Sequence, residues 1–353
     1  MKYLLAIFLV FLPYVKGEDC LWNRDTDFPE YPSLLMNEAT WQSYLPVLEG
    51  TERVIRVCQG ASIVIACPGS TISATGTEVA EGVCAGGTYV TVDGKNYDMK
   101  DLGCESRVSE TLASLSGSCG NDNDGVYICF DPDLEITIYT KHLLRGESVK
   151  ATDSNPSRPS FKSSSGIYSV SPNTCYEIDS QKTLMKNILG DSSVIDDSNS
   201  YYFARGHLSP DADFNTEMES DATYYYVNAV PQVANYQQWK FQETAIRDLA
   251  ASHQTDFQIW TGPYDILELD DTDGDPVICE LSTNKCLGVI TSNNPYIDSF
   301  PDPICDDICN EISWIDFDVN DLTRGAVYCC KVQDLHAAIP DAPNISGAGL
   351  LDN

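Results

Sequence analysis

The chain has 353 residues, with 21 basic against 53 acidic side chains, so its formal net charge is −32. Apolar residues make up 42% of the chain and aromatic residues 10%. This composition supports a packed core and excludes a chain that is disordered throughout. The negative charge argues against binding nucleic acid or anionic membranes over the whole surface. At about 100–200 residues per domain, the length favours two domains.

The N-terminus is predicted to be a secretory signal peptide. An apolar run over residues 4–12 follows Lys2, and the small residues Val15 and Gly17 have the spacing of a cleavage site. The run is too short to cross a bilayer, and a buried N-terminal helix is the alternative. We therefore expect residues 1–17 to be removed, the protein to be secreted and extracellular, and no membrane to be a partner.

The cysteines favour disulfides. There are 14, an even number, and all lie beyond the predicted leader. Zinc is the alternative, suggested by the spacing of Cys305 and Cys309 and by the adjacent Cys329 and Cys330. However, the chain has only four histidines and no pair of Cys-x-x-Cys spacings, so disulfides are preferred. A glycosylation sequon begins at Asn344.

The first third of the chain has short, strand-like segments between seven of the cysteines. Val54–Cys58 and Ala61–Cys67 are predicted strands on either side of a short turn, and Thr88–Val92 leads into Asp93-Gly94, a hairpin signal. Residues 18–130 are therefore predicted to form a small disulfide-rich β domain. The odd number of cysteines implies a bridge to the rest of the chain, or a boundary that is slightly displaced.

Residues 131–353 are predicted to form a second domain in which strands and helices are mixed. Strands are expected at residues 134–144, 201–203, 224–227, 257–263 and 327–332, and helices at 180–190 and 239–251. There is no regular alternation of strand and helix. This favours an α+β fold with a mixed, mainly antiparallel sheet over a doubly wound parallel sheet.

Candidate chemistry clusters between residues 203 and 247. His207 follows Arg205 and a glycine, and Asn235 begins a series with Trp239, Glu243 and Arg247 at four-residue steps. Side chains at that step share one face of a helix. Histidine can act as a general base, and phosphodiester cleavage needs such a base together with cations near the phosphoryl oxygens. Considered by itself, a lone histidine beside a glycine is more often structural.

These segments resemble the DNA/RNA non-specific endonucleases, a family with a ββα-metal finger, and in particular its secreted arthropod branch. The family motif is Asp-Arg-Gly-His, then Asn-x-x-Pro-Gln, then Asn-x-x-x-Trp-x-x-x-Glu-x-x-x-Arg. The resemblance covers roughly residues 130–340, while the cysteine-rich region resembles the arthropod branch alone. It implies a ββα-metal finger within the α+β domain.

The resemblance also implies roles for individual residues. His207 would be the general base that activates water. Asn235 would be the direct protein ligand of Mg²⁺ or Mn²⁺, and Glu243 would hold water molecules of that ion. Phosphate contacts would come from Arg205, Arg247 and, on weaker grounds, Arg158, and the supporting element would consist of Asn228 and Gln232. Ala204 stands where the motif has Asp, which leaves the orientation of His207 to other groups.

Other features have simpler explanations. The acidic segment 270–275 could bind calcium, but a solvated turn is favoured because the final glutamate of a calcium loop is missing. Tyr224–Tyr226 could stack on bases, although burial along a strand is favoured. The remaining histidines, at 142, 253 and 336, are expected to be structural or exposed.

The sequence thus predicts a secreted, metal-dependent, sugar-nonspecific endonuclease that hydrolyses DNA and double-stranded RNA to 5′-phosphate products, for example in a digestive tract. The alternative is a catalytically silent extracellular protein that binds nucleic acid or another ligand. A carbohydrate-binding role for the N-terminal domain is a third possibility. The net charge is reconciled with nucleic-acid substrates by a local basic groove, made of Arg158, Lys162, Arg205, Lys240 and Arg247.

Overall fold

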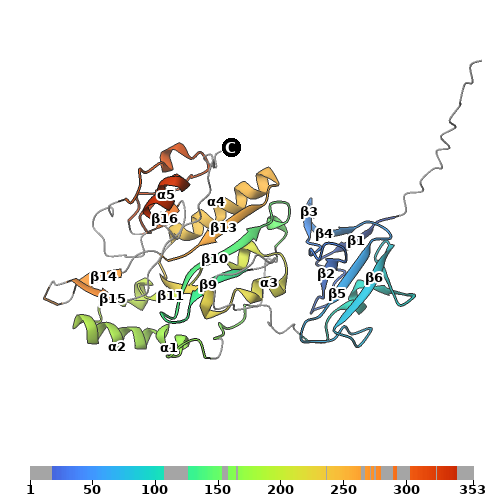
Figure 1. Cartoon of the computed structure of the whole chain (residues 1–353), viewed down its shortest axis with the longest axis horizontal. Helices are drawn as coiled ribbons and strands as arrows, with labels where there is room; N and C mark the ends of the chain where they lie inside the picture. Colours follow the sequence, from blue (N-terminus) through green and yellow to red (C-terminus); the bar gives the residue numbers. More distant parts are fainter. Residues whose placement is uncertain are drawn as a thin grey trace, which may run out of the picture. The chain divides into compact units, whose positions relative to one another are not determined.

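The computed structural model describes residues 18–106, 126–152, 158–163, 166–235, 237–263, 267–270, 272–273, 276–279, 289–291, 303–322 and 324–339. The chain divides into two compact units, residues 1–109 and 110–353 (Figure 1). The predicted leader and the sequon at Asn344 lie outside the described residues. Within the described residues, no helix combines the length and the apolar character that crossing a membrane requires.

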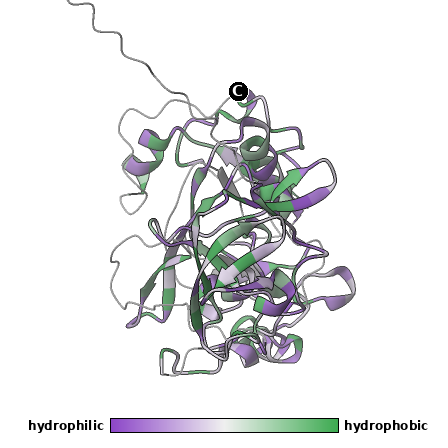
Figure 2. Cartoon of the chain, turned by 90° about the vertical axis from the view of Figure 1, so that its right-hand side faces the viewer, coloured by the Kyte–Doolittle hydropathy of each residue, from purple (hydrophilic) through white to green (hydrophobic). Residues whose placement is uncertain are grey.

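The first unit consists of two antiparallel sheets. Their strands are β1 (Cys20–Asn23), β2 (Leu34–Asn37), β3 (Val47–Glu49), β4 (Glu52–Val57), β5 (Ser62–Ala66), β6 (Val79–Gly86), β7 (Tyr89–Val92) and β8 (Lys95–Asp98). The strand orders are β1-β4-β3 and β2-β5-β6-β7-β8, and the short 3-10 helix η1 (Met99–Leu102) follows. Hydrophobic and hydrophilic residues alternate along several strands in Figure 2, as expected where one face of a strand is buried.

The two sheets of this unit share one apolar core. Ile55 and Val57 from β4 pack in the same cluster as Ile63 and Ile65 from β5. The predicted strands on either side of the first turn are therefore present but belong to different sheets, and the residues that connect them, 58–60, are exposed. Two disulfides, Cys20–Cys84 and Cys67–Cys104, link the unit internally.

The predicted hairpin turn has the backbone that its sequence requires. Asp93 and Gly94 both have positive φ, 49° and 76°, and they join β7 to β8 with Val92 opposite Lys95. Two consecutive positive φ values match the right-handed twist of the flanking strands, and Asp-Gly adopts them readily.

The second unit is built around a three-stranded antiparallel sheet in the order β13-β10-β9. Its strands and helices are β9 (Tyr127–Asp131), β10 (Ile136–Leu144), α1 (Pro172–Cys175), α2 (Ile178–Leu189), β11 (Phe203–His207), α3 (Glu217–Ala222), β12 (Ala229–Val233), α4 (Gln237–His253), β13 (Phe257–Thr261), β14 (Leu267–Asp270), β15 (Pro276–Cys279), β16 (Val289–Thr291), β17 (Val327–Cys329) and α5 (Val332–Ala338). Five 3-10 turns are η2 (Val149–Ala151), η3 (Asp197–Asn199), η4 (Asp211–Asp213), η5 (Tyr226–Asn228) and η6 (Cys309–Glu311).

The predicted α+β class is confirmed, since the named strands of this unit pair antiparallel and helices lie between them in the chain. The expected boundary at residue 130 falls inside β9, whose partner β10 belongs to the second unit.

Three predicted strands take another form. Of residues 201–203, only Phe203 belongs to a strand, β11, and Tyr201 makes an isolated bridge with Asp196. Residues 224–227 do not form a strand: Tyr225 makes only an isolated bridge with Lys162, and the chain then turns into η5. The reason is Asn228, whose side-chain amide donates to the carbonyl of Thr223 at 2.9 Å and so closes a turn. The strand expected at residues 327–332 stops at Cys329, and α5 begins at Val332.

The end of β17 is fixed by two disulfides, Cys305–Cys330 and Cys309–Cys329. Cys329 and Cys330 are adjacent, and their two bridges lead to different positions of the preceding segment, so the strand cannot simply continue. These pairings remove the zinc alternative for the four cysteines. Cys58 and Cys175 are exposed thiols.

Candidate active site

The ββα arrangement predicted for the motif is present. β11 pairs antiparallel with β12, with His207 opposite Ala229 and Ala204 opposite Gln232. Asn235 lies in the turn that leads from β12 to α4. A Cβ atom at Gly206 would lie 2.7 Å from the Cβ of Gln232, so only glycine allows the two strands to approach this closely here.

His207 is half-buried in an aromatic environment. Its ring centroid lies 5.0 Å from that of Phe161, and Tyr224 packs edge-on at 4.8 Å. The buried Nε2 atom has no hydrogen-bond partner among the described residues. Burial lowers the pKa of His207 to about 4; Asp211 opposes this shift and Arg158 adds to it. The imidazole is therefore neutral at pH 7, the form that can accept a proton.

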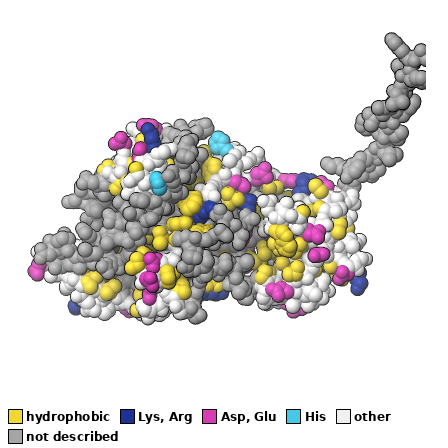
Figure 3. Space-filling model, in the orientation of Figure 1, with side chains coloured by type: hydrophobic (Ala, Val, Ile, Leu, Met, Phe, Trp, Pro, Cys, Tyr) yellow, Lys and Arg dark blue, Asp and Glu magenta, His cyan; other side chains and the backbone are white. Residues whose placement is uncertain are grey.

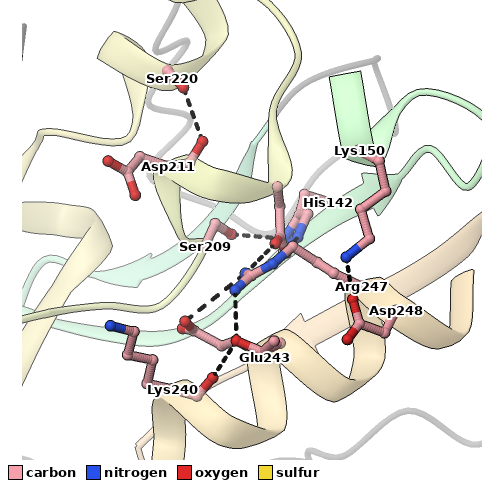
Figure 4. A network of polar contacts seen from close by, with 11 residues as sticks. His142, Lys150, Ser209, Asp211, Ser220, Lys240, Glu243, Arg247 and Asp248 are labelled. Carbon is pink, nitrogen blue, oxygen red and sulfur yellow. Dashed lines mark hydrogen bonds and ion pairs between the residues drawn. The ribbon is translucent and has the colours of Figure 1, made fainter. Parts of the chain in front are cut away.

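Glu243 and Arg247 project from α4 toward a set of buried polar groups (Figure 4). Burial and, to a lesser extent, the charge of Asp213 raise the pKa of Glu243 to about 7, against the opposing effect of Arg247. Arg247 Nη1 donates to Asp213 at 2.9 Å and lies 4.0 Å from the Glu243 carboxylate. The two helix residues thus share an electrostatic environment with Asp213.

Asp213 is the centre of a network that the sequence analysis missed. His142 Nε2 lies 2.8 Å from Asp213 Oδ2, and His142 Nδ1 lies 2.9 Å from Ser209 Oγ. Ser209 Oγ in turn donates to Thr140 at 2.9 Å. His142, expected to be structural or exposed, is 1% exposed. It lies on β10, 71 positions from Asp213, so no local pattern could have linked them.

Asn228 holds the segment that follows His207. Its side chain is fully buried, donates to the carbonyl of Ser209 at 2.8 Å and accepts from the Ser209 amide at 2.9 Å. This pair of hydrogen bonds locks the backbone two residues beyond His207, and it connects the residue to the His142 network through Ser209.

Arg205 is enclosed by aromatic rings. The guanidinium lies 5.2 to 5.8 Å from the ring centroids of Phe161, Tyr176 and Tyr226. Its Nε donates to the Tyr226 hydroxyl at 3.1 Å and its Nη2 to Asn173 Oδ1 at 3.0 Å. All these partners are neutral, so the positive charge of Arg205 is not cancelled by them.

Arg158 is the most exposed of the predicted phosphate contacts. Its side chain is 68% exposed, and its Nε lies 3.2 Å from Asp211 Oδ2. Of the other cations in the predicted groove, Lys162 and Lys240 are exposed, and Arg247 pairs with Asp213. The groove therefore contains carboxylates next to its cations. Figure 3 shows acidic side chains scattered over the face drawn there, with basic ones in small groups.

The structure brings most of the predicted residues into two neighbouring groups. His207, Arg158 and Arg205 lie around Phe161 and Asp211, whereas Glu243, Arg247 and Asn228 lie around Asp213 and Ser209. Asp211 relates the two groups, since its charge acts on both His207 and Glu243. Gln232 lies opposite Ala204 and packs close to Gly206, and Asn235 lies between the second strand and the helix.

Among the described residues, one group of three acidic, Cys or His side chains has the spacing for a metal: Asp307, Cys309 and Cys329. Its two cysteines form a disulfide with each other, which excludes them as thiolate ligands. In the predicted acidic calcium turn, Asp271 and Asp275 lie outside the described residues.

Comparison with known families shows to which family the chain belongs. The model of the DNA/RNA non-specific endonuclease family matches residues 113–335. The chain belongs to this family. The resemblance found in the motifs is thereby confirmed, and nucleic acid is the class of substrate. Endonucleases of this family generally depend on a divalent metal.

Two curated relatives have salivary names. The chain is 26% identical over 313 residues to a salivary endonuclease of Lutzomyia longipalpis, an alignment that covers 78% of this chain and 72% of the relative. It is 26% identical over 242 residues to salivary protein Tsal1 of Glossina morsitans morsitans, covering 60% of each. A crystal structure of the EndoG/EndoGI complex aligns over 45% of this chain and 58% of its own, with 19% identity and a TM-score of 0.29, a similarity too weak to show a shared fold.

Proposed function

We propose that the protein is a secreted, magnesium- or manganese-dependent endonuclease that hydrolyses phosphodiester bonds of DNA and double-stranded RNA, leaving 5′-phosphates. The observation that carries this proposal is the state of His207. It is a neutral, half-buried imidazole on the first strand of a ββα unit. The charge of Arg158 acts on it, and Arg205 lies over Phe161, the ring that packs against it.

His207 would act as the general base. Because its Nε2 atom is buried, Nδ1 is the nitrogen that can take a proton from a water molecule. The imidazole accepts this proton as the water attacks phosphorus, and the bond to the 3′ oxygen breaks. A low pKa keeps the base unprotonated in the free protein. The positive charge of Arg158 contributes to this low pKa, because a cation disfavours protonation of the nearby imidazole.

Asn235 and Glu243 would hold the divalent cation. Amide and carboxylate oxygens are the ligands that Mg²⁺ prefers, and such ions retain several water molecules. The raised pKa of Glu243 fits this role, because a buried carboxyl without a nearby dication resists ionisation. When bound, the ion supplies stabilisation of the negative charge on the phosphoryl and departing oxygens.

The three arginines would bind phosphate. Arg205 has only neutral partners, so it retains its charge for an anion, and Arg158 presents an exposed guanidinium. Arg247 would offer phosphate fewer N–H donors, because its Nη1 already donates to Asp213. Asn228 would support the site by fixing the backbone beyond His207, and Gln232 by packing against Gly206.

Extracellular location has three independent supports. The N-terminal residues have the pattern of a signal peptide, disulfides link cysteines of the described residues within each of the two units, and two relatives have salivary names. The silent binding protein is not favoured, because the family is one of nucleases. The proposed preference of this protein for double-stranded substrates rests on its resemblance to the arthropod branch.

The test is a nuclease assay with purified protein. Supercoiled plasmid and labelled double-stranded RNA should be cut in Mg²⁺ or Mn²⁺, protected by EDTA, and cut again when the metal is restored. His207→Ala should abolish both cuts. His253→Ala is the matched control, since His253 is an exposed histidine at the end of α4. Full activity of His207→Ala, or of wild type in EDTA, contradicts the proposal. Ligation of the products without prior phosphorylation tests for 5′-phosphates.

A further inference from the structure

We propose that Asp211 is a positioning residue that holds the guanidinium of Arg158 beside His207. This inference rests on the proposed nuclease function and adds a residue to it. The motif position that opens with a carboxylate in related sequences is Ala204 here, on β11 opposite Gln232. The carboxylate whose charge acts on His207 is instead that of Asp211, which lies in η4, four residues after the histidine.

The Asp211 side chain is held by burial and by one hydrogen bond, and its backbone is held by another. It is 12% exposed, and its Oδ2 atom accepts a hydrogen bond from the Tyr224 hydroxyl at 2.6 Å. Its backbone carbonyl accepts from Ser220 Oγ at 2.8 Å (Figure 4). A carboxylate with this many constraints has a defined orientation, so a group bound to it is also placed in a defined position.

Arg158 is the group that this carboxylate places. Its Nε lies 3.2 Å from the same Oδ2 atom, although its side chain is 68% exposed. Exposed ion pairs contribute little to stability, so a stabilising role does not account for the contact between Arg158 and Asp211. With Nε tethered to Asp211, N–H groups at the end of the guanidinium remain available to bind phosphate oxygens.

Tyr224 connects this clamp to the candidate base. Its hydroxyl binds Asp211, while its ring packs edge-on against His207 at 4.8 Å. The charges of Asp211 and Arg158 act on His207 in opposite directions. The three side chains therefore place a cation beside the neutral imidazole, where an attacked phosphate would lie if His207 activates the water.

A double-mutant cycle tests the inference. Asp211→Asn should lower kcat/KM on plasmid DNA by about tenfold, a loss typical of misplacing a group that contacts the transition state. Arg158→Ala should lower it at least as much. If Asp211 acts through Arg158, the double variant should be within about twofold of Arg158→Ala. Multiplied losses in the double variant, or no loss in Asp211→Asn, would overturn the inference.

Further readouts separate positioning from a purely structural role. Asp211→Glu should recover part of the rate. The acid limb of the pH–rate profile should move to lower pH in Asp211→Asn and to higher pH in Arg158→Ala, because the two charges shift the pKa of His207 in opposite directions. A limb that does not move contradicts the placement beside His207. Asp248→Asn is the control, since this exposed carboxylate on α4 pairs only with Lys150 among the described residues. Activity in His207→Ala would instead contradict the proposed function.

Discussion

The two halves of the candidate site are built on opposite principles. Around His207 the neighbours are aromatic rings, and Nε2 is left without a partner among the described residues. Around Asp213, six residues after His207, the polar groups form a continuous chain of hydrogen bonds and ion pairs through His142 and Arg247. The first half leaves a buried imidazole nitrogen unpaired, and the second pairs its buried groups with one another.

This difference separates the role of His207 from the role of Asp213 and His142. A buried polar group without a partner is unfavourable, so such a group in a native fold calls for a function. A buried charge that is paired from two sides is more simply a support. The contrast assigns chemistry to His207 and scaffolding to Asp213 and His142.

The largest effect is expected at the reactive half. His207→Gln keeps a polar side chain of similar size but removes the base, so the rate of plasmid cleavage should fall by about 10²- to 10⁴-fold. Far-UV circular dichroism and the melting temperature should change little, because the buried Nε2 atom that is lost with the ring has no hydrogen-bond partner among the described residues. A large fall in melting temperature would mean that His207 belongs to the scaffold instead.

The opposite result is expected at the scaffolding half. Asp213→Ala removes the shared partner of Arg247 and His142 and leaves both buried, which should lower the free energy of unfolding by about 3–5 kcal/mol. Urea denaturation measures this change. Activity should be lost through unfolding or misplacement of Glu243 and Arg247. A variant with wild-type stability would show that the network carries little of the fold.

The pH dependence of stability should separate the halves as well. The folded pKa of His207, about 4, is below the ordinary value of 6.5, so its stabilisation is present above pH 6.5 and is lost as the pH falls through 4. The folded pKa of Glu243, about 7, is above 4.5, so its stabilisation is present below pH 4.5 and is lost as the pH rises through 7. Between pH 7.5 and 5 each contributes about 2 kcal/mol, with opposite signs.

In the metal-free wild type the two contributions should largely cancel. His207→Gln should therefore gain about 2 kcal/mol relative to wild type on going from pH 7.5 to pH 5, and Glu243→Gln should lose about as much. Urea denaturation at both pH values, in EDTA, measures each difference. Identical pH dependence in all three proteins would show that neither pKa is shifted as described.

The smallest effect is expected outside both halves. Lys150 and Asp248 form an ion pair in which both side chains are about half exposed. Asp248→Asn should change the free energy of unfolding by less than about 1 kcal/mol and leave cleavage unchanged. A larger change would weaken the use of burial to distinguish scaffold from surface.

Sequence reasoning reached further in the ββα unit than elsewhere. The four-residue steps from Trp239 to Arg247 predicted the helix that became α4, because helical periodicity is local. The expectation failed for residues 224–227, where a buried asparagine side chain closes a turn that propensity for strands could not reveal. It also failed at the end of β17, where disulfides override a strand-like run.

The sequence by itself determined the family, the α+β class, the use of cysteines for disulfides and the order of the motif residues, because these depend on residue types and on short, fixed spacings. Only the tertiary structure decided that His207 is neutral, that Asp213 has His142 as a partner and that Asp211 holds Arg158. Those properties come from burial and from contacts between distant segments. A pKa depends on the groups that surround a side chain in space, and the neighbouring residues along the chain do not reveal which groups these are.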